Sequence, residues 1–158
     1  MIVVSDTSPL HYLILIKREE LLPQVYGRVV APAVVIEELS RAEAPDSVRR
    51  WVAKRPAWLE IRTPQLLTPE TSLLGSGEAA AISLAHEIGA KVVLIDERQG
   101  AKIARSEGLF VTGTLGVLEA GASRGLISLA DSLAALEQTN FHRSATLFAN
   151  LLRKYEPK

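Results

Sequence analysis

Four acidic residues stand at points of the chain where predicted strands end or predicted helices lie. They are Asp6, Glu38, Glu78 and Asp96. Asp6 follows a short apolar run that begins at Ile2, and Asp96 follows the run KVVLI. Carboxylates gathered in one place repel one another, and carboxylate oxygens are the ligands that Mg²⁺ and similar divalent cations prefer. A metal-dependent enzyme is therefore the first hypothesis that the sequence suggests.

Each of these four acids also has a structural interpretation. Asp6 could form a turn by accepting hydrogen bonds from the backbone that follows it. Glu38 lies beside Glu37 on a predicted helix, so at most one of the two points inward, and a single helical glutamate is usually solvated. Glu78 in a first helical turn is favoured by the helix dipole, and Asp96 could cap the helix after it. Only their meeting at one edge of a sheet favours chemistry.

The elements that would bring them together follow from an alternation of β-branched runs and helical segments. Strands are expected over residues 2–4, 28–31, 59–62, 91–95 and 109–111. A first helix is expected after Ser8, which would be its N-cap with Pro9 at the first helical position. Further helices are expected after Pro32, over residues 44–55, from Ser76 to the stop at Gly89, from Asp96 to about residue 107, and from Gly113. This alternation predicts an α/β fold with a mostly parallel sheet flanked by helices on both faces. Ligands of such sheets bind at the carboxyl ends of strands, where Asp6 and Asp96 fall.

Composition narrows the class of protein. The chain has 158 residues, which suggests a single domain over 1–158, and 47% of them are hydrophobic. The absence of cysteine excludes disulfides, cysteine-ligated zinc and thiol catalysis. Eighteen basic and eighteen acidic residues cancel, so nucleic-acid binding would need a local patch. No signal peptide and no apolar run of about 18 residues occurs, so we expect a soluble, cytoplasmic protein without a membrane contact. The histidines His11, His86 and His142 are expected to be packing or surface residues.

Five motifs, in order along the chain, carry a resemblance to a known family. They are DTSPL at residues 6–10, EL at 38–39, GEAAAISLA at 77–85, LIDE at 94–97 and GTLGVL at 113–118. These motifs resemble those of PIN-domain proteins, in particular the prokaryotic branch related to VapC toxins. The resemblance spans about residues 2–125. Two C-terminal helices are expected over about 128–155, separated near Asn140-Phe141, and this tail also looks like that branch.

The resemblance implies an α/β/α sandwich and a Mg²⁺- or Mn²⁺-dependent endoribonuclease that hydrolyses single-stranded RNA. Asp6, Glu38, Glu78 and Asp96 would be its catalytic, metal-binding residues, supported by Ser8 and Thr114. Many relatives have an aspartate where this chain has Glu97, which leaves open whether Glu97 reaches the metal. The implied reaction is in-line attack of a metal-activated water, leaving 5′-phosphate and 3′-hydroxyl ends. Toxins of this family usually pair with a small antitoxin protein and often form homodimers.

Two basic clusters could hold RNA. Arg98, Lys102 and Arg105 recur at helical spacing beyond Asp96 and would form a stripe beside the site, or a solvated helix face. The second cluster comprises Arg49, Arg50, Lys54 and Arg55 with Trp51 and Trp58 nearby, and here a solvated face is the favoured interpretation.

Other classes fit less well. A phosphatase of the haloacid dehalogenase type would need an aspartate at the position of Ser8, and a receiver domain would need an acidic pair at residues 5 and 6. The alternative from a different class is a non-catalytic PIN-like module that binds RNA or a protein partner.

Overall fold

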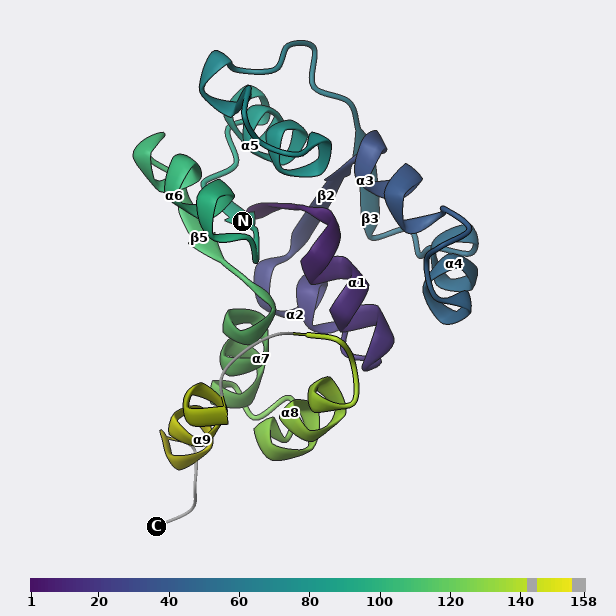
Figure 1. Cartoon of the computed structure of the whole chain (residues 1–158), viewed down its shortest axis with the longest axis vertical. Helices are drawn as coiled ribbons and strands as arrows, with labels where there is room; N and C mark the ends of the chain where they lie inside the picture. Colours follow the sequence, from purple (N-terminus) through teal and green to yellow (C-terminus); the bar gives the residue numbers. More distant parts are fainter. Residues whose placement is uncertain (142–144, 155–158) are drawn as a thin grey trace.

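A five-stranded parallel sheet forms the centre of the molecule (Figure 1). The structure is a computed structural model and describes residues 1–141 and 145–154, so His142 and the expected helix end at Tyr155 lie outside it. The strands are β1 (Ile2–Ser5), β2 (Arg28–Pro32), β3 (Leu59–Arg62), β4 (Val92–Leu94) and β5 (Phe110–Thr112). Their order is β3-β2-β1-β4-β5, and every neighbouring pair is parallel. The prediction of a mostly parallel sheet is confirmed.

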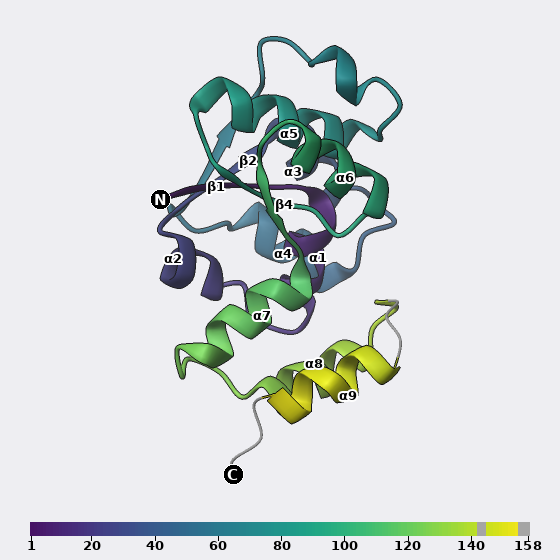
Figure 2. The same cartoon turned by 90° about the vertical axis from the view of Figure 1, so that its left-hand side faces the viewer.

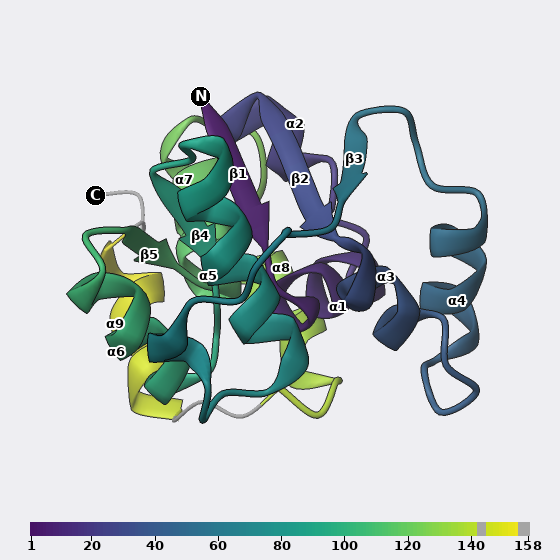
Figure 3. The same cartoon turned by 90° about the horizontal axis from the view of Figure 1, so that it is seen from above.

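Strand β1 occupies the middle of the sheet, between β2 and β4 (Figure 3). From β1 the chain builds outward through β2 and β3, then returns to the other side of β1 for β4 and β5. The strand order therefore reverses between β1 and β4, and open parallel sheets bind their ligands at such a point. The backbone N–H of Asp6 donates to the carbonyl of Leu94 over 2.9 Å. The segments that leave β1 and β4 thus begin side by side.

Helices cover both faces of the sheet. They are α1 (Thr7–Leu15), α2 (Leu21–Tyr26), α3 (Ala33–Leu39), α4 (Asp46–Ala53), α5 (Ser76–Ile88), α6 (Arg98–Ser106), α7 (Thr114–Ser123), α8 (Leu129–Glu137) and α9 (Ala145–Lys154), with a 3₁₀ turn η1 (Pro69–Thr71). Successive strand residues point to opposite faces. Val4 and Val93 pack with α5 and α6, whereas Val3 and Leu94 pack with α1, α2, α4, α7 and α8. The two layers of helices confirm the α/β/α sandwich.

The C-terminal helices join one of these layers. Helices α8 and α9 lie side by side beyond α7 (Figure 2). Phe148 of α9 is 5% exposed and belongs to the same core cluster as Val3 of the central strand. The tail therefore packs on the core that supports the sheet. No helix within residues 1–141 and 145–154 is long and apolar enough to cross a membrane.

Several predicted boundaries are wrong. Helix α1 begins at Thr7 with Asp6 in the capping position, so Ser8 is not its N-cap. Helix α6 begins at Arg98 and is capped by Glu97, whose side chain accepts the N–H groups of Gln99 and Gly100, instead of by Asp96. Helix α4 is also shorter than predicted, because it ends at Ala53. The six-residue helix α2 and the turn η1 were not predicted.

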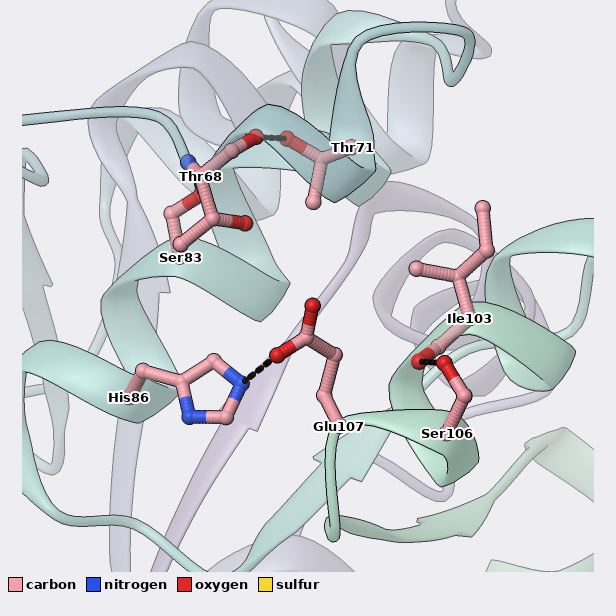
Figure 4. Close-up of polar contacts among 7 residues, drawn as sticks. All are labelled: Thr68, Thr71, Ser83, His86, Ile103, Ser106 and Glu107. Carbon is pink, nitrogen blue, oxygen red and sulfur yellow. Dashed lines mark hydrogen bonds and ion pairs between the residues drawn. The ribbon is translucent and has the colours of Figure 1, made fainter.

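A contact between side chains links the C-terminal end of α5 to the residue that follows α6. His86 of α5 faces Glu107, which follows α6, with 3.2 Å between Nε2 and Oε2 (Figure 4). Nearby, the backbone N–H of Thr68 donates to the hydroxyl of Ser83 over 2.9 Å, which ties the loop before α5 to that helix. His86 is a surface residue, as predicted. The His86–Glu107 pair thus links two helices whose other ends carry Glu78 and Glu97.

Candidate active site

Asp6 lies at the centre of the candidate site. It follows β1 directly, is 3% exposed, and its Oδ1 has no hydrogen-bond partner in the part of the chain that the structure describes. Burial raises the pKa of its carboxyl from 3.8 to about 8, and repulsion from Glu78 is the second cause. Glu38 and Asp96 raise this pKa further, while a hydrogen bond with the backbone of Thr7 lowers it. A buried carboxyl held against three others has the properties expected of a cation ligand.

Glu38 reaches the site from helix α3. It is half-buried, whereas its neighbour Glu37 is exposed. The hydroxyl of Thr7 donates to Oε2 of Glu38 over 2.5 Å. Thr7 is the residue after Asp6, so one short segment carries the central carboxyl and also orients a second. Sequence reasoning did not assign this role to Thr7.

Three donors among the described residues orient Asp96. Its Oδ2 accepts hydrogen bonds from Ser8 over 2.9 Å and from the hydroxyl of Thr114 over 2.7 Å. Its Oδ1 accepts the backbone N–H of Thr114 over 2.7 Å. The hydroxyls of Ser8, on α1, and Thr114, on α7, therefore fix a carboxylate that follows β4. This network explains why Asp96 turns away from the helix that it was expected to cap.

Glu78 enters the site because glycine precedes it. A Cβ atom at Gly77 would lie 2.5 Å from Oδ1 of Asp6 and 3.3 Å from Oε2 of Glu38. Any side chain there would displace the two carboxylates or the first turn of α5. The absence of a side chain at Gly77 lets α5 bring Glu78 close enough to raise the pKa of Asp6.

Glu97 is at the rim of the site and is engaged locally. Its two carboxylate oxygens accept the backbone N–H groups of Gln99, over 2.9 Å, and Gly100, over 2.6 Å. It is exposed, although it also lines the hollow described next. Capping α6 is therefore its structural role.

Three adjoining hollows run through the acids. The first, here the Glu38 hollow, has a volume of 320 Å³ and is lined by Asp6, Ser8, Glu38, Glu78, His11 and Tyr12, among others. The second, the Asp96 hollow, measures 240 Å³ and shares Asp6, Ser8, Tyr12 and Glu78 with it, adding Asp96, Glu97 and Phe141. The third, the arginine groove, measures 690 Å³ and shares Asp96 and Glu97 with the second. The shared lining residues show that the three hollows adjoin one another.

Two of the three residues in the predicted basic stripe line the arginine groove. Arg98 and Arg105 line it, together with Leu115 of α7 and Leu147 of α9. Lys102 is exposed and is not among the lining residues. Two of the three cations thus face the groove that Asp96 also lines.

The second basic cluster is engaged elsewhere. Arg49 pairs with Asp46 and donates to the carbonyl of Ala44. Trp51 donates to Glu19 over 3.1 Å, and its ring centroid lies 5.8 Å from that of Trp58. Both tryptophans pack against the main core cluster. These contacts favour the structural interpretation of this cluster.

The donor set fits a hard divalent cation. It consists of carboxylates, and the buried Oδ1 of Asp6 is the kind of oxygen that such an ion would satisfy. Within residues 1–141 and 145–154, no three histidine or acidic side chains already converge at the spacing of a bound ion. The carboxylates repel one another, as the raised pKa of Asp6 shows, and this repulsion is a physical reason why they stay apart without a bound ion.

The comparisons with known proteins agree with this architecture. The sequence profile of the family DUF3368, described as a PIN domain, matches residues 2–157. A PilT N-terminus domain protein from the hyperthermophilic archaeon Sulfolobus solfataricus P2 has a similar solved structure, with a TM-score of 0.52 and 14% sequence identity. The match covers 91% of this chain and 100% of that one, and at this identity it concerns the fold alone. A search of curated proteins returned no match.

Proposed function

The chain belongs to the PIN-domain family, whose fold is generally of the nuclease type, and from this premise we propose that it is a metal-dependent endoribonuclease acting on single-stranded RNA. Asp6 carries the proposal. Its Oδ1 is buried, has no partner in the described ranges, and belongs to a carboxyl whose pKa burial and three neighbouring carboxylates raise. A protein that used Asp6 only as a turn-former would satisfy this oxygen with backbone N–H groups.

The residues that would hold Mg²⁺ or Mn²⁺ are Asp6, Glu38, Glu78 and Asp96. When bound, such an ion supplies an activated water and neutralises charge on the leaving oxygen of a phosphodiester. Thr7 holds Glu38, while Ser8 and Thr114 hold Asp96, so the ligand oxygens are oriented before the ion arrives. Glu97 remains the helix cap in this proposal, because both of its oxygens already accept backbone N–H groups.

The arginine groove is the proposed path of the RNA backbone. Phosphate needs cations near a site that is otherwise acidic, and Arg98 and Arg105 line the groove that begins at Asp96. Arginine suits this task because its planar guanidinium can bind phosphate oxygens in pairs.

We further propose that the protein acts as a toxin, which is the most specific part of the proposed function. It rests on the resemblance to the VapC-related branch, and it includes a small antitoxin protein as partner, a homodimer and a cytoplasmic location. Induced expression should then arrest growth, the Asp6→Asn variant should not, and co-expression of the antitoxin should restore growth. Arrest by both forms would contradict it.

The nuclease function is tested by cleavage of a labelled single-stranded oligoribonucleotide in Mg²⁺ or Mn²⁺. We expect cutting that EDTA abolishes and that Asp6→Asn lowers by at least about a hundredfold. Glu20→Gln is the matched control, because Glu20 is an exposed carboxylate before α2, and α2 leads into the amino end of β2. Binding of RNA without any cleavage would instead support the non-catalytic module.

A further inference from the structure

Three ring side chains stand beside the acids, and the proposed reaction gives them no role. His11 and Tyr12 lie on α1, the helix that begins immediately after Asp6, and both line the Glu38 hollow. Tyr12 also lines the Asp96 hollow, where Phe141 joins it. Each of the three side chains is half-buried. Tyr12 therefore lines both hollows together with Asp6 and Glu78, while His11 lines one of them and Phe141 the other; these three rings are here called the aromatic wall.

Contacts hold these rings at defined angles. The ring centroids of Tyr12 and Phe141 are 4.9 Å apart with planes at 79°, and those of His11 and Tyr12 are 4.8 Å apart at 76°. Both pairs have the edge-to-face geometry that aromatic rings favour. The hydroxyl of Tyr12 donates to Oδ1 of Asn140 over 2.9 Å. Tyr12 and Phe141 also pack on the main core cluster, and this packing holds the two rings in place.

We infer that this aromatic wall is a subsite for an unpaired nucleobase of the RNA strand, next to the phosphate at the acidic site. The inference rests on the proposed function and gives that site its preference for single strands. Proteins hold unpaired bases by stacking them on aromatic side chains, which tolerates any base identity. A base within a duplex has both faces covered and could not reach a ring recessed among carboxylates.

The distribution of charge along the hollows supports this occupant. Carboxylates line both the Glu38 hollow and the Asp96 hollow, and arginines line the adjoining arginine groove. The Glu38 hollow combines His11, Tyr12 and Asn140 with the carboxylates of Asp6, Glu38 and Glu78, and none of the described residues that line it is a lysine or an arginine. Burial lowers the pKa of His11, which favours its neutral form. The carboxylates of the Glu38 hollow repel phosphate, so its rings suit the uncharged base of a nucleotide, while the arginine groove suits its phosphates.

Asn140 adds a polar edge to the subsite. Its amide oxygen accepts a hydrogen bond from Tyr12. Because Asn140 is exposed, its NH₂ group is the part of the amide that would donate to a base. Asparagine amides donate to and accept from the edges of bases. The subsite therefore combines stacking on Tyr12 with one hydrogen-bonding group at its rim.

The test measures binding of labelled eight-nucleotide RNAs by fluorescence anisotropy, with Ca²⁺ in place of Mg²⁺ and a gel to verify that the RNA stays intact. One RNA has all its bases, and each of the others lacks the base at one position. We expect one abasic position to weaken binding to the wild-type protein about tenfold. Tyr12→Leu should weaken binding of the complete RNA by a similar factor and remove the additional effect of that abasic position. Tyr12→Phe should keep the effect, because the ring remains.

Two controls make the outcome decisive. Arg98→Gln should weaken binding of all RNAs alike and keep the abasic effect, since Arg98 lies in the arginine groove. Phe141→Leu replaces Tyr12→Leu if the latter does not fold. An abasic effect that is absent, or that survives loss of the ring, overturns the inference. If the wild-type protein still cleaves RNA in that case, the proposed function stands; a wild-type protein that neither cleaves nor binds RNA overturns both.

Discussion

Replacing Asp6 by asparagine should stabilise the metal-free protein. Asp6 is 3% exposed and its Oδ1 has no hydrogen-bond partner in the part of the chain that is described. Burial, then repulsion from Glu78, raises the pKa of its carboxyl from 3.8 to about 8. Asparagine has nearly the same shape and no charge, so the variant removes the unfavourable ionisation and leaves the packing.

The size of the effect follows from the shift in pKa. At pH 7 the unfolded chain would release the proton of Asp6, whereas the folded chain, with a pKa of about 8, would largely keep it. At about 1.4 kcal/mol per pH unit, the interval from 3.8 to 7 destabilises the folded state by about 4 kcal/mol. Relaxation and water entry reduce this value, so we expect a gain of about 2–4 kcal/mol for Asp6→Asn.

The stability gained in Asp6→Asn should increase as the pH rises from about 4 to 8. Below about pH 4 both the folded and unfolded states hold the proton, so Asp6 carries no penalty. Between pH 4 and 8 the unfolded state binds fewer protons than the folded state, and the stability contributed by Asp6 falls as pH rises. The difference between variant and wild type should therefore be small near pH 4 and largest near pH 8.

Urea unfolding in EDTA at pH 4.5, 7 and 8 measures this difference. A gain of 2–4 kcal/mol corresponds to a midpoint higher by about 1–2 M urea at pH 7. Glu20→Gln should leave the midpoint unchanged, because Glu20 is exposed. The reasoning is refuted if Asp6→Asn is no more stable than wild type at pH 7, or if its gain is the same at pH 4.5.

Three further substitutions, two of them with a control variant, test the residues around Asp6 and the arginine groove. Gly77→Ala should destabilise the protein by about 1–3 kcal/mol in urea unfolding, because its Cβ would lie 2.5 Å from Oδ1 of Asp6; unchanged stability would contradict the close approach. Thr7→Val removes the donor to Glu38 and should lower Mn²⁺ affinity by about tenfold in calorimetry, whereas Thr7→Ser should restore most of it; equal affinity of the valine variant would exclude the role of Thr7. Arg105→Gln should reduce the salt dependence of RNA binding by about 0.7 in slope, and Lys102→Gln should reduce it less; equal effects would argue against the arginine groove.

Much of the fold is predictable from short-range pattern. Strands β1, β2 and β4 contain runs of β-branched residues, and parallel pairing follows from the helices between the strands. Helix starts were less predictable, because Glu97 caps α6 with both carboxylate oxygens while Asp96 bonds to Thr114, which is 18 residues away. Spacing in the sequence does not reveal such a partner. Helix α2 was missed because it has only six residues and includes Pro23.

The candidate site could likewise be predicted only in part. Asp6 and Asp96 follow neighbouring strands, so their meeting follows from strand order alone. The inward direction of Glu38 depends on how α3 packs, and that of Glu78 on the close approach at Gly77, so the family motifs were needed to select them. Thr7 was overlooked because its hydrogen-bond partner is 31 residues away. Tyr12 follows Ser8 by four residues, so both lie on one face of α1. Because Ser8 was expected beside Asp6, this spacing was the signal in the sequence that Tyr12 also faces the acids.

Calorimetric titration of Mn²⁺ into the metal-free protein, in two buffers of different ionisation enthalpy at pH 7, tests the central claim most directly. The claim is that the four carboxylates form one cation site with Asp6 at its centre. We expect saturable binding with release of about one proton, because the pKa of Asp6 is raised to about 8 and the ion must displace that proton. Asp96→Asn should abolish or strongly weaken the binding, and Glu20→Gln should not. Absence of saturable binding to the wild-type protein, or binding unaffected by Asp96→Asn, would contradict the account.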